Sequence, residues 1–182
     1  MTTAVQPFSG TYSADPVHSS FGFAVDYAGT GKFRGTFDDV SATLTPSDDG
    51  LSVEGSARVE SISIKNPPQF RDHVLGPDFF DAEKHPEVTF RSTLVELEED
   101  GTARLDGELT LAGTTRPVAI AGTWSEPVPA AGGGLRAGLE LATVIDRRDF
   151  GFEWQMELPG GGDALAYDVT LEVNLYLIQP EG

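Results

Sequence analysis

Apolar and polar residues alternate with a period of two along most of this chain. Leu171, Val173, Leu175 and Leu177 show it most clearly, and the run 21–27 follows the same rule with aromatic residues. Such alternation predicts strands that bury one face and leave the other in water. The runs predicted as strands are 10–15, 18–28, 33–45, 51–64, 86–98, 102–112, 115–126, 136–146 and 165–178, the first two forming one bent strand in one interpretation.

Turn signals between these runs predict how the strands connect. Pro46–Gly50, Glu98–Gly101 and Ala112–Thr115 each separate two alternating runs, which is typical of hairpins. The strands are long, and an antiparallel sheet of this size tends to close because closure removes exposed edges. We therefore expect an all-β fold: one domain over residues 1–182, built as an eight-stranded antiparallel barrel, with residues 1–9 as a flexible tail.

The segment 65–86 breaks the alternation. Pro67 and Pro68 are tolerated at a helix start, and Phe70, Val74 and Leu75 then fall on one helical face. Gly76 and Pro77 end that helix, and a second turn, 78–82, presents Phe79 and Phe80. The segment is predicted to be a helical insert that caps one end of the barrel.

Charge and composition narrow the function classes. The chain carries 29 acidic against 12 basic side chains, a net charge of −17, which disfavours binding to nucleic acids and to anionic membranes. It has no cysteine, so disulfides and thiolate chemistry are excluded. No apolar run is long enough to span a membrane, and the N-terminus does not read as a signal peptide, so a cytoplasmic location without membrane insertion is expected.

The aromatic residues at inward parity are the first candidates for a site. Phe21, Phe23 and Tyr27 share one parity and are expected to line an apolar ligand cavity, the alternative being a filled core. The insert residues are expected either to form a lid that opens or a plug that never moves. The full set of candidate ligand-binding residues is Phe21, Phe23, Tyr27, Phe37, Phe70, Val74, Phe79, Phe80, Phe90, Trp124, Phe150 and Arg147.

Arg147 is the polar member of that set. It lies in the charged turn Asp146–Asp149, and a guanidinium there suits a pyrophosphate or quinone head group. The alternative is a salt-bridged turn that closes the barrel end. Both interpretations remain open from the sequence.

The residue types associated with metals and catalysis do not form a recognisable pattern. His18, His73 and His85 are spaced unlike metal ligands, so no metal or other cofactor is expected, although a pH-sensitive contact between His73 and His85 remains an alternative. Asp15, His18 and Ser19 resemble a nucleophile trio in composition, but adjacent strand residues point to opposite faces. The chain is therefore not expected to be an enzyme.

An ordered set of short motifs resembles the YceI-like family of lipocalin-like, polyisoprenoid-binding proteins. The motifs are His18-Ser19 before the aromatic strand, Gly35-Thr36-Phe37, the run 59–64, Arg71-Asp72-His73-Val74-Leu75, Asp78-Phe79-Phe80-Asp81, the run 86–92, the run 107–118 and Asp146-Arg147-Arg148-Asp149-Phe150-Gly151. The resemblance covers about residues 10–178. It implies an extended eight-stranded barrel with a helical cap, a tunnel for an isoprenoid chain, and homodimers in some members. It also implies that Arg71 and Asp72 of the insert are partners of the charged turn.

The alternation predicts an apolar ligand inside the barrel, and the resemblance implies that this ligand is a polyprenyl chain or prenyl quinone, bound for carriage or sequestration. Two alternatives stay open. The barrel is also a plausible scaffold for an enzyme that cyclises a flexible apolar substrate by confinement. It is equally compatible with a stress-linked interaction module whose interior is solid and binds no ligand.

Overall fold

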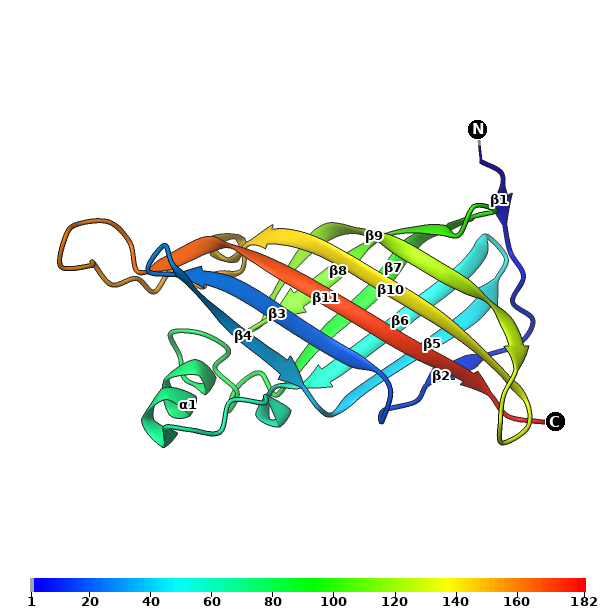
Figure 1. Ribbon diagram of the computed structural model, residues 1–182, viewed down its shortest axis with the longest axis horizontal. Helices are drawn as coiled ribbons and strands as arrows, with labels where there is room; N and C mark the ends of the chain where they lie inside the picture. The colour runs from blue at the N-terminus through cyan, green and yellow to red at the C-terminus, as the bar shows by residue number, and fades with distance from the viewer. Residues whose placement is uncertain (1) are drawn as a thin grey trace.

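A computed structural model describes residues 2–182 and shows one antiparallel sheet that closes on itself (Figure 1). The N- and C-termini lie at one end of this elongated barrel, and the loop 151–164 and a short helix lie at the other (Figure 1). The strands are Ala4–Val5 (β1), Tyr12–Ala14 (β2), Ser20–Tyr27 (β3), Gly31–Phe37 (β4), Val40–Ser47 (β5), Gly50–Arg58 (β6), Glu87–Glu98 (β7), Thr102–Leu111 (β8), Thr114–Pro129 (β9), Leu135–Asp146 (β10) and Leu165–Gln179 (β11).

The last strand closes the barrel. β11 pairs with β10 without interruption from Leu135↔Gln179 to Asp146↔Asp168. Its opposite edge pairs with β2 near the C-terminus and with β3 over the rest of its length. The ring therefore runs β10-β9-β8-β7-β6-β5-β2-β11 and back to β10, which confirms the expected eight-stranded antiparallel barrel.

The β3–β4 hairpin extends the wall at the helical end. β4 pairs along β3, whereas its other edge makes one bridge, Phe37↔Ile62. The expected strand 33–45 is wrong as one element, because the chain turns at Asp38–Asp39 and β5 leaves to pair with β2 and β6. The expected strand 51–64 likewise ends at Arg58, where a 3₁₀ turn, Val59–Ser61, directs the chain toward the insert.

The insert contains one helix, Pro68–Leu75 (α1), as the proline and apolar positions predict. The following residues fold back on its C-terminal end: Phe80 N–H donates to Val74 and Ala82 N–H donates to Leu75. Arg71 fixes the helix to the barrel rim, since its guanidinium donates to the backbone carbonyls of Glu60, Ile62 and Ile64. α1 and its turn therefore cover one barrel end (Figure 1).

The N-terminal segment differs from the expected flexible tail. β1 pairs with β7 through Ala4↔Glu98 and Val5↔Leu97, and Phe8 is only 3% exposed. The Phe8 ring packs edge-on against Tyr12 at a centroid distance of 5.1 Å and lies 6.4 Å from Trp124. The buried ring and the strand pairing with β7 together offset the chain entropy that the segment loses.

The interior consists of two regions. The first, which we call the packed half, lies at the termini and is built from Phe8, Tyr12, Leu44, Trp124, Leu139, Leu177 and their neighbours. The second, the hollow half, lies under α1 and is built from Phe37, Ile62, Val74, Phe80, Phe152, Leu171 and their neighbours. Among residues 2–182, no helix is long and apolar enough to cross a membrane.

Candidate functional site

The hollow half contains a cavity of about 530 Å³. Phe21, Phe23 and Val25 of β3 line one wall, and Phe33 and Phe37 of β4 continue it. The insert and the 151–164 loop cover the rest, and Leu111, Ile145, Leu165, Val169 and Leu171 complete the lining. This volume lies in the range of small-molecule pockets, and its wall is almost wholly apolar.

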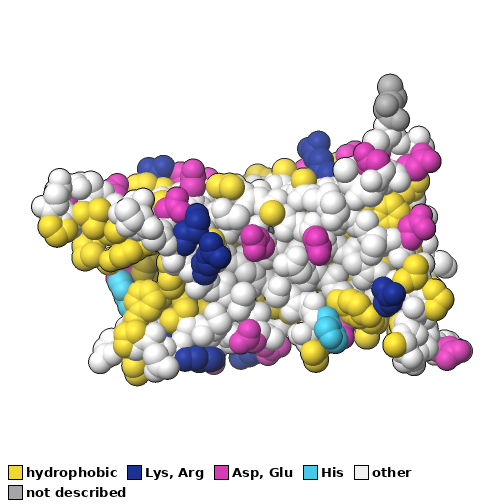
Figure 2. All heavy atoms as spheres, viewed as in Figure 1, with side chains coloured by type: hydrophobic (Ala, Val, Ile, Leu, Met, Phe, Trp, Pro, Cys, Tyr) yellow, Lys and Arg dark blue, Asp and Glu magenta, His cyan; other side chains and the backbone are white. Residues whose placement is uncertain are grey.

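The cavity reaches the surface between the β3–β4 hairpin and α1. Tyr27 and Phe70 line it and remain 42% and 40% exposed, and Lys32 beside them is exposed as well. Phe33 and Phe70 meet edge-to-face across this opening at a centroid distance of 5.3 Å. The free edge of β4 forms no ladder here, so side-chain contacts rather than backbone hydrogen bonds close the wall. Hydrophobic side chains gather at this end of the molecule, beneath the protruding loop (Figure 2).

An aromatic cluster joins the insert to the 151–164 loop. The Trp154 ring lies 5.0 Å from His73 and 5.6 Å from Phe79, while Phe152 packs edge-on against Phe80 at 5.2 Å. His73 Nε2 is also 3.0 Å from a carboxylate oxygen of Asp78. The rim of the cavity therefore combines aromatic rings with one imidazole.

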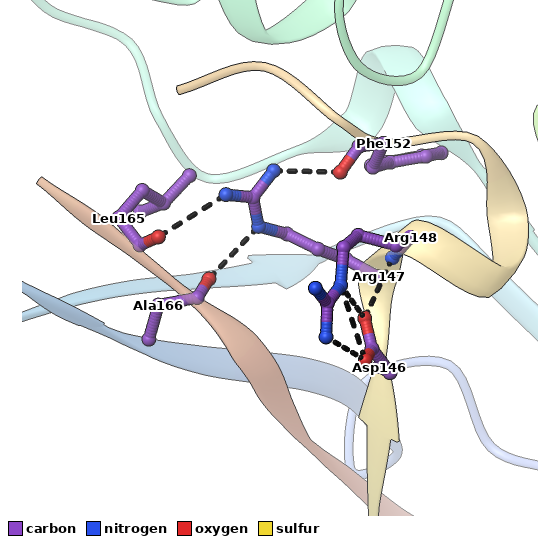
Figure 3. A network of polar contacts seen from close by, with 6 residues as sticks. All are labelled: Asp146, Arg147, Arg148, Phe152, Leu165 and Ala166. Atoms are coloured by element: carbon purple, nitrogen blue, oxygen red, sulfur yellow. Dashed lines mark hydrogen bonds and ion pairs between the residues drawn. The ribbon is translucent and has the colours of Figure 1, made fainter. Parts of the chain in front are cut away.

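Arg147 holds the loop that carries Phe152 and Trp154. It is 3% exposed, and its guanidinium donates to three backbone carbonyls: Nε to Ala166, Nη1 to Phe152 and Nη2 to Leu165 (Figure 3). Burial lowers the pKa of Arg147 from its ordinary value. A buried cation that bonds three carbonyls fixes the start of β11 against the 3₁₀ turn Arg147–Phe150, and its side chain lines the cavity.

The neighbouring Arg148 behaves differently. Its guanidinium is exposed and pairs with Asp146 at 2.7 Å (Figure 3), and it lies over the Tyr167 ring at 4.1 Å from the centroid. The hydrogen bonds from Arg148 lower the pKa of Asp146 to about 2. The expected salt-bridged turn is therefore present as Asp146–Arg148, but the expected partnership with Arg71 and Asp72 is wrong, because Arg71 bonds the barrel rim instead.

The candidate ligand-binding residues separate into two groups. Those that line the 530 Å³ cavity are Phe21, Phe23, Tyr27, Phe37, Phe70, Val74, Phe79, Phe80 and Arg147. Phe90 lines a smaller inner void, Phe150 is buried without reaching the cavity, and Trp124 belongs to the packed half. Ligand contact by these residues stays a prediction.

Several lining residues escaped the sequence reasoning. Phe33 lies in the expected strand 33–45. That strand breaks at Asp38–Asp39, and only the pairing of its first part with β3 brings Phe33 beside Phe23. Phe152 and Trp154 lie in a loop without periodicity, where no sequence pattern predicts direction. Val169 has the same parity as Leu171, so the alternating run 165–178 already predicts that Val169 points into the barrel.

The histidines and the candidate nucleophile trio bond different partners. His18 bonds Asp15 at 2.7 Å, whereas His73 bonds Asp78, so the alternative contact between His73 and His85 is not part of the hydrogen-bond network. Ser19 is buried, and its hydroxyl accepts from the backbone N–H of Tyr176. Within residues 2–182, no group of three metal-ligating side chains converges.

Comparison with known proteins places the chain in a sequence family. The profile of the YceI-like domain matches residues 12–177. A UPF0312 protein of Pseudomonas putida (strain W619) is 29% identical over 181 residues, covering 94% of this chain and 90% of that protein. A UPF0312 protein of Pseudomonas syringae pv. tomato is 31% identical over 179 residues, with the same coverage.

Two solved structures show the same fold at low sequence identity. BcnA of Burkholderia cenocepacia superposes with a TM-score of 0.71 at 18% identity, over 91% of this chain and 99% of that one. A polyisoprenoid-binding domain from Saccharophagus degradans, implicated in plant cell wall breakdown, superposes with a TM-score of 0.65 at 12% identity, over 93% and 98% of the two chains.

Proposed function

This chain belongs to the YceI-like family, and we propose that its barrel binds an isoprenoid-type lipid, a polyprenyl chain or prenyl quinone, for carriage or sequestration. The observation that carries the proposal is the apolar cavity of about 530 Å³ in the hollow half. The structural likeness to a polyisoprenoid-binding domain supports the same class of ligand.

The chemistry of the wall favours a hydrocarbon chain over a polar ligand. Phe21, Phe23, Phe33, Phe37 and Phe80 present rings and no hydrogen-bonding groups, so a polar ligand would lose its hydrogen bonds to water without replacement. A branched hydrocarbon gains free energy from every buried methyl and methylene group. The cavity therefore suits the tail of a prenyl lipid.

The polar groups of the lining gather near the opening. Lys32 and His73 belong to the rim, and Arg147 lies beneath the 151–164 loop. A head group that remains there would keep contact with water and with cationic side chains, while the tail occupies the aromatic part. In this arrangement Arg147 positions the loop through its three carbonyl contacts, while its guanidinium also lies 4.6 Å from the centroid of the Tyr167 ring.

The proposal is tested by native mass spectrometry of the purified protein, followed by organic extraction and lipid analysis. We expect a bound species whose masses are spaced by one isoprene unit. Absence of a bound lipid, together with no uptake after incubation with prenyl quinones, would contradict the proposal. Product formation from a polyene would instead identify a cyclising enzyme.

We propose a role as a binding protein rather than an enzyme. We also propose that nucleic acid is not a partner, because the net charge of −17 repels phosphate backbones. A cytoplasmic location and a homodimer stay predictions. Size-exclusion chromatography with light scattering would test the dimer directly.

A further inference from the structure

We propose that Phe21 limits the length of the bound chain, and that a small void behind it forms a subsite for the terminal unit of a longer hydrocarbon tail. This inference rests on the proposed function. It adds a residue that sets chain length and a second compartment inside the barrel.

The void lies deeper in the barrel than the main cavity and has a volume of about 90 Å³. It exists because small residues, Ala42 of β5 with Gly55 and Ala57 of β6, occupy inward positions there. Phe90 of β7, the direct strand partner of Gly55, and Leu109 of β8 continue the same wall. A void of this size with so few polar groups offers a water molecule almost no hydrogen-bond partners, so it suits apolar atoms.

Phe21 and Leu171 form the partition between the two spaces. They contribute to the lining of both the 530 Å³ cavity and the 90 Å³ void. The Phe21 ring is stacked on Phe37 at a centroid distance of 5.5 Å with an interplanar angle of 17°. Leu171 is nearly fully buried on the central strand β11, whereas Phe21 is only partly buried. Phe21 is therefore the member of the partition with room to change.

Behind the void the barrel is closed. Leu44, Leu139 and Leu177 have no exposed surface, and Phe8, Tyr12 and Trp124 fill the end. A tail that enters between the β3–β4 hairpin and α1 stops at the Phe21 ring. Where that ring is displaced or truncated, the tail extends into the void and no further. The total length of the two spaces sets an upper limit, and the Phe21 ring sets a shorter one.

The test measures binding of a series of prenyl alcohols that differ by one isoprene unit, from farnesol upward, to the wild-type protein and to Phe21→Ala. We expect the longest chain that forms a one-to-one complex in native mass spectrometry to increase by at least one isoprene unit in Phe21→Ala. The dissociation constant for that chain should fall by about tenfold, the usual effect of fitting an added hydrocarbon group into a pocket.

Two other variants delete the same number of atoms and serve as controls. Phe33→Ala enlarges the main cavity at the opening, and Phe33 does not line the void. Phe90→Ala enlarges the void but leaves the partition in place. Neither should move the length limit. Phe21→Leu, a smaller truncation, repeats the test if Phe21→Ala fails to fold.

The outcomes separate this inference from the proposed function. If the wild-type protein binds prenyl alcohols and the Phe21 variants show the same length limit, the role of Phe21 is wrong while the proposed function stands. If the wild-type protein binds none of them, the proposed function fails and the length limit fails with it. Crystals pressurised with xenon give an independent reading of the void: we expect a xenon atom beside Ala42 and Gly55, and its absence would overturn the subsite.

Discussion

The two halves of the barrel share one sheet and one rule of alternation, yet one is filled and the other is hollow. In the packed half, leucines from facing strands interdigitate, and Phe8, Tyr12 and Trp124 fill the end. In the hollow half, phenylalanines contact one another along the wall, through the Phe21–Phe37 and Phe37–Phe80 pairs, and leave the axis open. Alternation determines which residues point inward, whereas the balance of side-chain volumes decides whether they meet.

The difference has an energetic consequence. Cavities cost stability because their walls lose contacts, and a void of about 90 Å³ corresponds to about 2 kcal/mol at 24 cal/mol per Å³. This void lies where the packed half meets the hollow half, since residues of both line it. In the hollow half, the wall residues lack packing partners that a bound ligand can supply.

The largest expected difference between the halves comes from one truncation made in each. Phe8→Ala removes a buried ring from the packed half and should lower the free energy of unfolding by about 3–5 kcal/mol. Phe33→Ala removes a partly exposed ring at the cavity opening and should cost about 1 kcal/mol. Urea unfolding followed by tryptophan fluorescence measures both. Equal losses would contradict the division into a packed and a hollow half.

Substituting Arg147 tests how the 151–164 loop is held in place in the hollow half. Arg147→Met leaves the carbonyls of Phe152 and Ala166 without this donor, while Leu165 keeps a second one from Gln155, and should lower the free energy of unfolding by about 2–3 kcal/mol. Arg148→Met is the matched control, since it removes an exposed ion pair with Asp146 and should cost less than about 1 kcal/mol. Denaturant midpoints give both values. Similar effects for the two arginines would show that the carbonyl network is not important for stability.

Alanine substitutions at two glycines compare a tightly packed position with one that has room for a side chain. A Cβ at Gly122, in the sheet of the packed half, would lie 1.8 Å from the Glu140 carbonyl oxygen, so Gly122→Ala should destabilise the protein by about 1–3 kcal/mol. A Cβ at Gly55, beside the void, would find its nearest atoms at ordinary contact distance, 3.4 Å. Gly55→Ala should therefore be neutral or stabilise by up to about 1 kcal/mol, because it reduces the freedom of the unfolded chain. Thermal unfolding measures both, and a stabilising Gly122→Ala would contradict the geometry.

The smallest expected effect is a pH dependence at the edge of the hollow half. Asp146 has an ordinary pKa of 3.8 and a folded-state pKa of about 2, so its charged form stabilises the folded protein above pH 3.8. This contribution should be lost as the pH falls from 3.8 toward about 2. Melting temperatures should fall less steeply over that window in Asp146→Asn than in the wild-type protein. Parallel curves would show that the ion pair with Arg148 does not couple to folding.

Much of the fold could be predicted from local patterns. Alternation indicated the strands and their inward faces, turn residues indicated the hairpins, and the prolines of the insert indicated α1. Phe21, Phe23 and Tyr27 were placed on the cavity side by parity alone. These predictions succeed because a strand has a period of two whatever it packs against.

The places where prediction failed depend on partners far away in the sequence. Trp124 has the parity of an inward residue, but only strand pairing puts it beside Phe8 in the packed half. The break at Asp38–Asp39 reflects a change of partner from β3 to β2 and β6, and the order of the N-terminal segment depends on β7 and Tyr12. None of these pairings leaves a periodic signal.

The sequence by itself determined an acidic, cysteine-free antiparallel barrel with an apolar interior and a helical cap, because period, turn residues and charge act locally. Only the tertiary structure decided that the interior is hollow at one end, that Arg147 bonds three carbonyls rather than a carboxylate, and that Phe21 separates two spaces. The reason is that a cavity is the volume left over between side chains from many strands, and that volume exists only after the strands have found their register.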